Sequence, residues 1–470
     1  MKIVNYILLL VTFVMVGCEE LPTENVNTLP SMQPNYVDIT IPANIAPLNF
    51  AMSDSAQGVE VYVDGELLDN SGSNKMMFNV GKWKKMMASK KGETVSVVVE
   101  ATYGDKKRRY NPFTWTIADS IDPYMTYRLI EPDYEVFQNL EIRERCVENF
   151  DERAINTYHV IGNRCMNCHT YANNDPNMSM MYVRGEGGGA ILNEKGVLRK
   201  LNIEKTPDMV SSSVYFGFSP SQRYITFSTN VIVPAFHSNA NKRMEVFDSK
   251  SDVYVADVNT GKIIPAPQLA DSMMLETFPN FSRDGKYIYF CRAAVENSIE
   301  DLQYDLCRVS FDEDKGTIGD SIETVIKAVK GQKNSVSHPR VSPDGNYLLY
   351  TVADYGTFPI WHQESDLRMM DLRTGAIDSL RDVNSDRSDT YHCWSSNGRW
   401  FVFASKRDDG LYGKPYFCYV DTAGTVHKPF VLPQENPLYY DYTLKSFNVP
   451  ELGKGKVPFD AQSVRKIVEN

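Results

Sequence analysis

The sharpest chemical signal in the chain is the run Cys165-Met166-Asn167-Cys168-His169. This C-x-x-C-H spacing puts two thiols where they can add to the two vinyl groups of a haem, and the next residue is a histidine that can bind the iron. A bare C-x-x-C pair could instead be half of a zinc site or a thioredoxin-like redox pair. A zinc site would need a second ligand pair at matching spacing, and none is evident. The motif therefore predicts one covalent haem c, held by Cys165 and Cys168, with His169 as axial ligand.

The sequence leaves the sixth ligand of that iron open. Met178, Met180 and Met181 follow closely, and a thioether ligand would raise the haem potential. Each of these methionines could equally be an ordinary packing residue. A histidine such as His159 or His237 would give a bis-imidazole centre of lower potential, and an open position would permit peroxide chemistry. The candidates for sixth ligand are Met178, Met180, Met181 and His237.

The N-terminal residues indicate export and a lipid anchor. Residues 1–17 carry Lys2 followed by an apolar run that is too short to span a membrane, which is typical of a signal peptide. The run ends in Met15-Val16-Gly17-Cys18, which resembles a bacterial lipobox, so we expect Cys18 to be lipidated. Residues 18–35 are expected to form a flexible tether. Because haem c is attached outside the cytoplasm, the leader and the motif agree on a lipoprotein of the cell envelope, in the outer membrane.

Composition narrows the possible partners. The chain has 470 residues, and 42% of them are hydrophobic, which excludes wholesale disorder. Lys and Arg number 49 against 60 Asp and Glu, so the net charge is −11 and no long basic run exists. This excludes a duplex nucleic-acid partner, because phosphate contacts need clustered cations. An acidic surface would suit a protein partner with a basic patch.

Elements that would position the motif can be predicted on both sides of it. In residues 36–120, short alternating strands such as Val59–Val63 and Val95–Ala101 surround an Asp64-Gly65 hairpin turn. They predict an immunoglobulin-like β-sandwich without a catalytic constellation. The cysteines outside the motif and the lipobox are interpreted as structural, and their odd number leaves at least one without a partner within the chain. They are Cys146, Cys291, Cys307, Cys393 and Cys418.

Beyond residue 200 the chain repeats. The units are Phe218–Phe227, Phe281–Phe290, Val341–Tyr350 and Trp394–Phe403, and each has a turn such as Asp-Gly or Asn-Gly between two strands. Further strand-turn-strand units, such as residues 253–262, follow most of them, and four strands per repeat make a β-propeller blade. The S-P-D-G-x-Y pattern resembles the TolB-type (PD40, WD40-like) propeller family over residues 200–430. We expect an all-β chain: the sandwich, then a propeller of about six blades over residues 121–440. A haem segment at about residues 150–180 would be inserted in it, and residues 441–470 would form a C-terminal tail.

The whole order resembles TolB-like haem c lipoproteins of Bacteroidota, a resemblance that bears on architecture more than on activity. Three further histidines, His338, His362 and His392, could line a common site against the haem, or each could be a turn histidine bonded to the backbone. Neither a G-x-S-x-G elbow nor a His-x-x-x-His pair is present, so no catalytic residues are assigned.

Three functions fit these features. The first is electron transfer through a mono-haem centre on a propeller that docks an unknown redox or envelope partner. The second is a non-enzymatic binding or assembly module in which the haem is structural or sensory. The third is a haem peroxidase, which would need a vacant sixth position and a nearby base or arginine. Arg164 and Arg184 are candidates for the latter.

Overall fold

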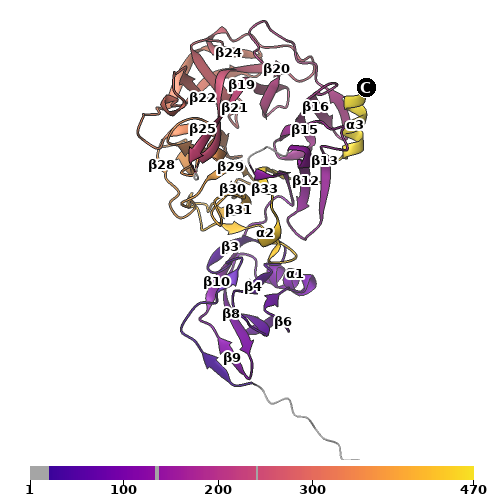
Figure 1. Cartoon of the computed structure of the whole chain (residues 1–470), viewed down its shortest axis with the longest axis vertical. Coiled ribbons are helices and arrows are strands. Elements are labelled where there is room, and N and C mark those ends of the chain that lie inside the picture. The colour runs from indigo at the N-terminus through magenta and orange to yellow at the C-terminus, as the bar shows by residue number, and fades with distance from the viewer. Residues whose placement is uncertain (1–20, 133–136, 240–241) are drawn as a thin grey trace, which may run out of the picture.

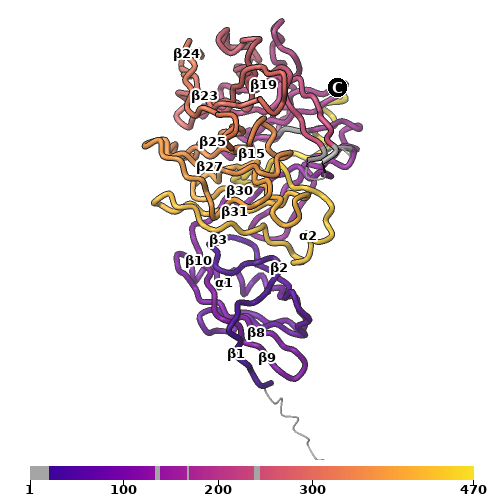
Figure 2. The backbone as a smooth tube through the Cα atoms, turned by 60° about the vertical axis from the view of Figure 1, so that its left-hand side comes forward, coloured from indigo at the N-terminus to yellow at the C-terminus, as the bar shows by residue number. Residues whose placement is uncertain are grey.

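The computed structural model describes residues 21–132, 137–239 and 242–470, and these form a β-sandwich at one end and a β-propeller at the other (Figure 1). The predicted all-β architecture is thereby confirmed. The two parts are joined directly: the Trp400 indole donates a hydrogen bond to the Asp119 carbonyl at 2.7 Å, and Ser396 bonds Asp122. Figure 2 shows the sandwich stacked below one side of the propeller. Among the described residues, no helix is long and apolar enough to cross a membrane.

The N-terminal sandwich is built from short strands whose buried positions alternate, as in β5. Its core holds Trp83 and Trp115, with ring centroids 5.6 Å apart. Trp83 comes from a helix, α1 (Val80–Ser89), which was not expected; the Asn79 side chain caps its first backbone N–H groups. The strands are β1 (Thr23–Asn25), β2 (Met32–Gln33), β3 (Ile39–Pro42), β4 (Phe50–Met52), β5 (Gly58–Val63), β6 (Glu66–Ser71), β7 (Lys75–Met76), β8 (Thr94–Tyr103), β9 (Lys106–Arg109) and β10 (Phe113–Ala118).

The range expected to be a flexible tether is in part structured. β1 pairs in parallel with β9, and β2 pairs with β4, so the sandwich begins at residue 23 rather than at residue 36. Backbone hydrogen bonds to existing strand edges hold these segments, although their sequence is rich in Pro, Asn and Thr. The signal peptide residues and Cys18 lie outside the described residues.

The propeller has six sheets among the described residues, which we number as blades 1 to 6. In each blade the strands are antiparallel neighbours, and the innermost strand lies at the centre of the ring. Blade 1 is β33 (Ser446–Gly453), β11 (Tyr124–Ile130), β12 (Glu141–Cys146) and β13 (Glu152–Thr157); blade 2 is β14 (Met166–Ala172), β15 (Asp175–Val183), β16 (Gly189–Glu194) and β17 (Val197–Lys200); blade 3 is β18 (Ser213–Phe218), β19 (Tyr224–Asn239) and β20 (Lys242–Asp257); blade 4 is β21 (Met274–Phe281), β22 (Tyr287–Ala294), β23 (Asp305–Asp312) and β24 (Thr317–Ile326); blade 5 is β25 (Ser335–Val341), β26 (Tyr347–Ala353), β27 (Asp366–Asp371) and β28 (Ile377–Asp378); blade 6 is β29 (Asp389–Trp394), β30 (Trp400–Ser405), β31 (Lys414–Tyr419) and β32 (Phe430–Val431).

The ring closes through the end of the chain. β33 is the innermost strand of blade 1, where it pairs with β11, and it contacts β14 on one side and β29 on the other. The helix α3 (Ala461–Glu469) then packs on β13 and β17, while α2 (Tyr439–Tyr442) precedes β33. Residues 441–470 are therefore part of the propeller and not the expected tail. A closing strand of this kind pairs inner edges that would otherwise be open.

The haem insertion expected at residues 150–180 is absent as a separate element. These residues form β13, β14 and part of β15, which are ordinary strands of blades 1 and 2. The prediction of an inserted segment came from interpreting the haem motif as a stretch that lies between strand-like residues on either side. The structure instead turns from β14 to β15 at Asn173 and Asn174, both with positive φ (52° and 60°), as a two-residue hairpin requires.

Candidate functional site

The same irregularity occurs on the innermost strand of every blade. On each of these strands, two residues lie opposite a single residue of the neighbouring strand, which defines a β-bulge. The first bulge residue has positive φ in five blades, with values from 49° to 55° at non-glycine residues. Such backbone costs about 1–3 kcal/mol at each position. The bulge pairs are Asn167–Cys168, Tyr215–Phe216, Phe278–Pro279, His338–Pro339, Tyr391–His392 and Val449–Pro450.

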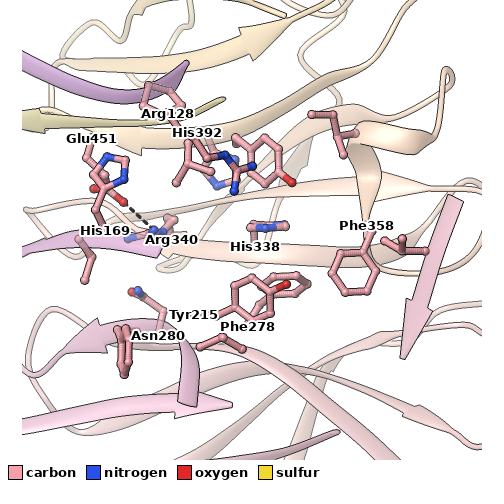
Figure 3. Close-up of a pocket in the computed structure, with 18 of the residues that line it drawn as sticks. Arg128, His169, Tyr215, Phe278, Asn280, His338, Arg340, Phe358, His392 and Glu451 are labelled. Atoms are coloured by element: carbon pink, nitrogen blue, oxygen red, sulfur yellow. Dashed lines mark hydrogen bonds and ion pairs between the residues drawn. The ribbon is translucent and has the colours of Figure 1, made fainter. Parts of the chain in front are cut away.

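These bulges surround a cavity of about 420 Å³ at the centre of the propeller, which we call the channel pocket. Five of the six bulge pairs line it, and a volume of this size is that of a typical small-ligand site. Most of the wall is apolar and aromatic, including Phe278, Phe358 and Ile360. Its polar side chains gather on one side, where Figure 3 shows His169, Arg340 and Glu451 close together.

The C-x-x-C-H motif supplies the sixth bulge. Met166 pairs with Val183 and His169 pairs with Met181, so that residues 167 and 168 lie opposite Tyr182 alone. His169 follows the bulge directly, as Asn280, Arg340 and Glu451 do in other blades, and all four line the channel pocket. The turn after the motif begins four residues beyond His169, as Asp284 stands four residues beyond Asn280. The motif is thus one copy of the propeller repeat, and this spacing is the signal that would have revealed it.

The His169 side chain is buried at the edge of the channel pocket. Its side chain is buried, with 6% of its surface exposed, and neither ring nitrogen meets a hydrogen-bond partner of good geometry among the described residues. Burial is the main cause that lowers the pKa of His169 to about 3; the charges of Arg128 and Arg340 contribute to this lowering, and a hydrogen bond with the Thr126 backbone opposes it. The imidazole is therefore neutral at physiological pH, which is the form that binds a metal.

Charged residues border His169 in the channel pocket. Arg340 and Glu451 form an ion pair at 2.9 Å, in which Glu451 is almost fully buried. Arg128 is buried as well, and Arg184 lines the same wall. Sequence reasoning missed Arg128, Arg340 and Glu451, because they come from strands of blades 1 and 5 that meet only in the folded ring.

The two cysteines of the motif are described to different extents. The Cys165 thiol is half-buried just before β14; burial raises its pKa, while Arg184 and Arg128 act to lower it. It packs against the core that contains Met181 and is not among the residues that line the channel pocket. The backbone of Cys168 lies in the bulge, but its side chain is outside the described residues.

Part of what a haem c requires is present at this site. A neutral, buried imidazole lies beside a cavity whose wall is mostly apolar, and Cys165 lies four residues before it in the chain, outside the pocket lining. Arg128, Arg184 and Arg340 are cations of the kind that bind propionates. No cluster of three His, Cys, Asp or Glu side chains in the described part of the chain could hold a bare metal ion.

The four sequence candidates for a sixth ligand lie away from this pocket. Met178 and Met180 pack in a core with Leu192 and Phe227, and Met181 packs in a separate core where its sulfur accepts a hydrogen bond from Asn156 at 3.7 Å. His237 is on the long hairpin of blade 3 and pairs with Glu245 at 3.2 Å. None of the four is among the residues that line the channel pocket.

The other histidines and arginines weighed from sequence separate into two groups. His338, His392 and Arg184 line the channel pocket together with His169. His362 is buried outside it and bonds Glu364 at 2.9 Å. His159 is in the turn after β13, bonded to Asn163, and Arg164 donates to backbone carbonyls of nearby turns.

No protein family profile matches the chain, and no curated protein matches it by sequence. Similar solved structures include TolB from Acinetobacter baumannii (11% identity, TM-score 0.42, covering 80% of this chain and 85% of that one). Others are an oligogalacturonate lyase in complex with manganese (12%, 0.38, 62% and 70%) and a puromycin-hydrolysing peptidase of Mycobacterium tuberculosis (12%, 0.37, 87% and 57%).

Proposed function

We propose that this chain is an electron-transfer protein with one haem c, attached through Cys165 and Cys168 at the channel pocket. The observation that carries the proposal is the position of His169. It follows the bulge of blade 2 on the central ring and is buried, neutral and without a hydrogen-bond partner of good geometry, where five other bulges form an apolar cavity. A histidine kept in this state solely for packing would cost stability, since unpaired buried polar atoms are unfavourable by about 1–3 kcal/mol.

Each group of residues at the site has a distinct task in this proposal. The two thiols fix the position of the cofactor, and His169 binds it from the wall of blade 2. The aromatic and proline side chains of the neighbouring bulges exclude water and lower the local dielectric. Arg128 and Arg340 hold negative charge at the polar side of the pocket. A haem held in this manner supplies reversible one-electron transfer.

The rest of the chain serves this centre as support and anchor. The propeller and sandwich would present the pocket to a redox or envelope partner, and the net charge of −11 favours a partner with a basic patch. We further propose that Cys18 carries a lipid that holds the protein at the outer membrane. Detergent phase partitioning of the full chain and of Cys18→Ala tests this, since the variant should leave the detergent phase.

The test of the function begins with protein produced in a bacterial host competent for cytochrome c maturation. The wild type should keep its haem through acid-acetone extraction and in denaturing gels, and its iron should cycle reversibly in a potentiometric titration. The double variant Cys165→Ser/Cys168→Ser should be colourless with an unchanged circular dichroism spectrum. Cys307→Ala, which removes a buried thiol of blade 4, is the matched control and should retain the haem.

Two results would contradict the proposal. A folded but colourless wild-type protein from such a host would exclude a haem c. A covalent haem whose iron does not return to its starting spectrum after reduction and reoxidation would exclude electron transfer, and would favour a structural or sensory haem on a binding module.

A further inference from the structure

The channel pocket carries its charged groups and its aromatic rings on different sides. Figure 3 shows Arg340 and Glu451 on one side of the cavity, and Phe278 and Phe358 on another. Burial of a charged group without a polar partner is unfavourable, and so is exposure of aromatic surface to water. A ligand that fills this cavity must therefore be polar at one end and apolar at the other.

The polar side of the pocket is rich in arginine. Arg128, Arg184 and Arg340 line the pocket, and Glu451 is the one carboxylate among its described lining residues. That carboxylate already pairs with Arg340 at 2.9 Å. The charges of Arg184 and Arg128 both act on the Cys165 thiol, which places these two guanidinium groups in the same region. Arg184 is exposed and makes no side-chain hydrogen bond or ion pair with another described residue, so it can bind an anion.

The histidines of the pocket add no positive charge at neutral pH. Burial lowers the pKa of His169 and of His392 to about 3, and it lowers the pKa of His338 well below its usual value. The positive charge of the pocket therefore comes from arginine, inside a chain whose net charge is −11. A charged cavity with low-dielectric walls concentrates ions of the opposite sign, which here are anions.

The aromatic side of the pocket is a packed cluster of rings. Tyr215 and Phe278 lie with their centroids 4.4 Å apart, and Phe358 meets Phe278 edge-on at 5.7 Å. Ile360 and Trp361 continue this wall. Aromatic rings in tilted or edge-to-face contact stabilise one another beyond the burial of their surface. This side of the pocket therefore favours a ligand with an aromatic body.

A long hairpin forms part of the pocket wall. Its strands β19 and β20 have 16 residues each, and Ile232 and Val246 from these strands line the pocket. The Tyr355 hydroxyl donates a hydrogen bond to Glu245 Oε2 at 3.0 Å, which holds this hairpin of blade 3 against the loop after β26 in blade 5. The hairpin reduces the contact of a bound ligand with water, and a lower local dielectric strengthens hydrogen bonds between charged groups.

We propose that the channel pocket binds a small organic acid with an aromatic body, its carboxylate at Arg184 and its ring against Phe278 and Phe358. The cavity of about 420 Å³ has the volume of a small-ligand site. Guanidinium and carboxylate groups form paired, charge-assisted hydrogen bonds. An inorganic anion would leave the aromatic side unfilled. The inference does not rest on the proposed function, because none of these three residues belongs to the haem motif.

The test uses phenylpropionate and phenylbutyrate as probes, the amide of each as its uncharged counterpart, and acetate as an anion without a ring. Isothermal titration calorimetry is performed on the full chain carrying Cys165→Ser/Cys168→Ser, which cannot attach haem. Each acid should bind with a Kd of about 1 mM or tighter, as expected for ligands of this size. Each acid should also bind at least about tenfold more tightly than its amide, and acetate should give no measurable heat.

Variants of the same haem-free chain locate the binding site. Arg184→Gln should weaken binding of both acids by about tenfold and leave the amides unchanged. Arg199→Gln is the matched control, because it removes a partly exposed arginine from the outer strand of the same blade, outside the pocket. Ile232→Trp reduces the volume of the cavity without a change in charge, and it should weaken acids and amides alike.

Three results would overturn the inference: no binding of either acid to the haem-free chain, equal affinity for an acid and its amide, or equal losses in Arg184→Gln and Arg199→Gln. The same titration with wild-type protein separates this inference from the proposed function. A colourless wild type that binds the acids contradicts the haem alone. Acids that bind the haem-free chain but not a haem-loaded wild type support the inference and show that haem and acid share the cavity.

Discussion

Blades 2 and 4 have the same bulge on their inner strands and use it for different purposes. In blade 4 the bulge is Phe278–Pro279 followed by Asn280, and these residues form part of the pocket wall. In blade 2 two residues again lie opposite one residue of the neighbouring strand, but the residues here are Asn167 and Cys168, followed by His169. The fold thus provides six equivalent positions around one cavity, and the proposed function assigns the chemistry to the residue types at one of them.

The comparison also separates strain from function. The first bulge residue is in the left-handed region in blades 3, 4, 5 and 6 and at Val449 in blade 1, whether or not it bears a functional group. Backbone strain alone therefore does not identify the site in this protein. His169, His338 and His392 each have a buried ring nitrogen without a described hydrogen-bond partner, and the Nε2 of His392 lies 2.9 Å from the Leu349 carbonyl oxygen.

The largest stability effect is expected at the ion pair between blade 5 and the closing strand. Arg340→Ala would leave Glu451 buried without its partner, and removal of one member of a buried pair costs about 3–5 kcal/mol. Arg308→Ala is the matched control, because its partner Glu323 is more than half exposed and such pairs are worth about 0–1 kcal/mol. Urea unfolding of both haem-free variants measures the difference. Equal losses would show that Glu451 does not depend on Arg340.

Much of this architecture is readable from the sequence. The repeated turns of blades 3 to 6 predicted strand, turn and strand, and the observed hairpins follow them, with Gly285, Gly345 and Gly398 in the left-handed region. The alternating strands of the sandwich were also predicted. Blade 2 was not recognised because Asn173 and Asn174 replace the Asp-Gly turn, although asparagine adopts the same positive φ.

Long-range pairing explains the rest of what was missed. β33 pairs with β11, more than 300 residues earlier in the chain, and no local pattern in residues 446–453 indicates this. The candidate site shows the same limit. His169 follows from the motif, but its neighbours Arg128, Arg340 and His338 come from other blades, and only closure of the ring brings them into one pocket.

The second prediction uses pH to distinguish His169 from a bulge residue without a titrating side chain. The pKa of His169 is about 3 when folded and about 6.5 when unfolded, so between these values the unfolded chain binds a proton that the folded chain does not. Stability of the haem-free protein should therefore fall as the pH drops from 6.5 toward 3, by up to about 1.4 kcal/mol per pH unit from this residue. Above pH 6.5 the contribution disappears.

The measurement is the difference between wild type and His169→Leu at each pH. This difference removes the contribution of other buried groups, such as Asp248, whose pKa is raised by burial to about 7 and whose effect has the opposite sign. The variant should gain on the wild type steadily below pH 6.5. A difference that stays constant between pH 4 and pH 6.5 would mean that His169 is solvated or charged in the folded protein.

The smallest effect concerns the turns that follow the bulges in blades 2 and 5. Gly345 has φ of 75°, and a methyl group there would have ample space, since the nearest atom to it would be the Arg283 Cβ at 3.9 Å. Gly345→Ala should therefore cost about 1 kcal/mol from the backbone alone.

Asn174→Gly should relax the backbone of the equivalent turn in blade 2. It should nevertheless destabilise by about 1 kcal/mol, because the Asn174 amide donates to the carbonyls of Trp394 and Leu452 at 2.8 and 3.0 Å.

Asn174→Asp distinguishes the two contributions at this turn. Aspartate tolerates positive φ about as well as asparagine does, but it cannot donate to the two carbonyls. We therefore expect it to be at least as destabilising as Asn174→Gly in urea unfolding of the haem-free protein. If Asn174→Gly instead stabilises the protein, the bonds to blade 6 and to β33 contribute less than the strain of the turn. Blade 2 would then be held in the ring by the packing of its strands, as blade 5 is, and not by this side chain.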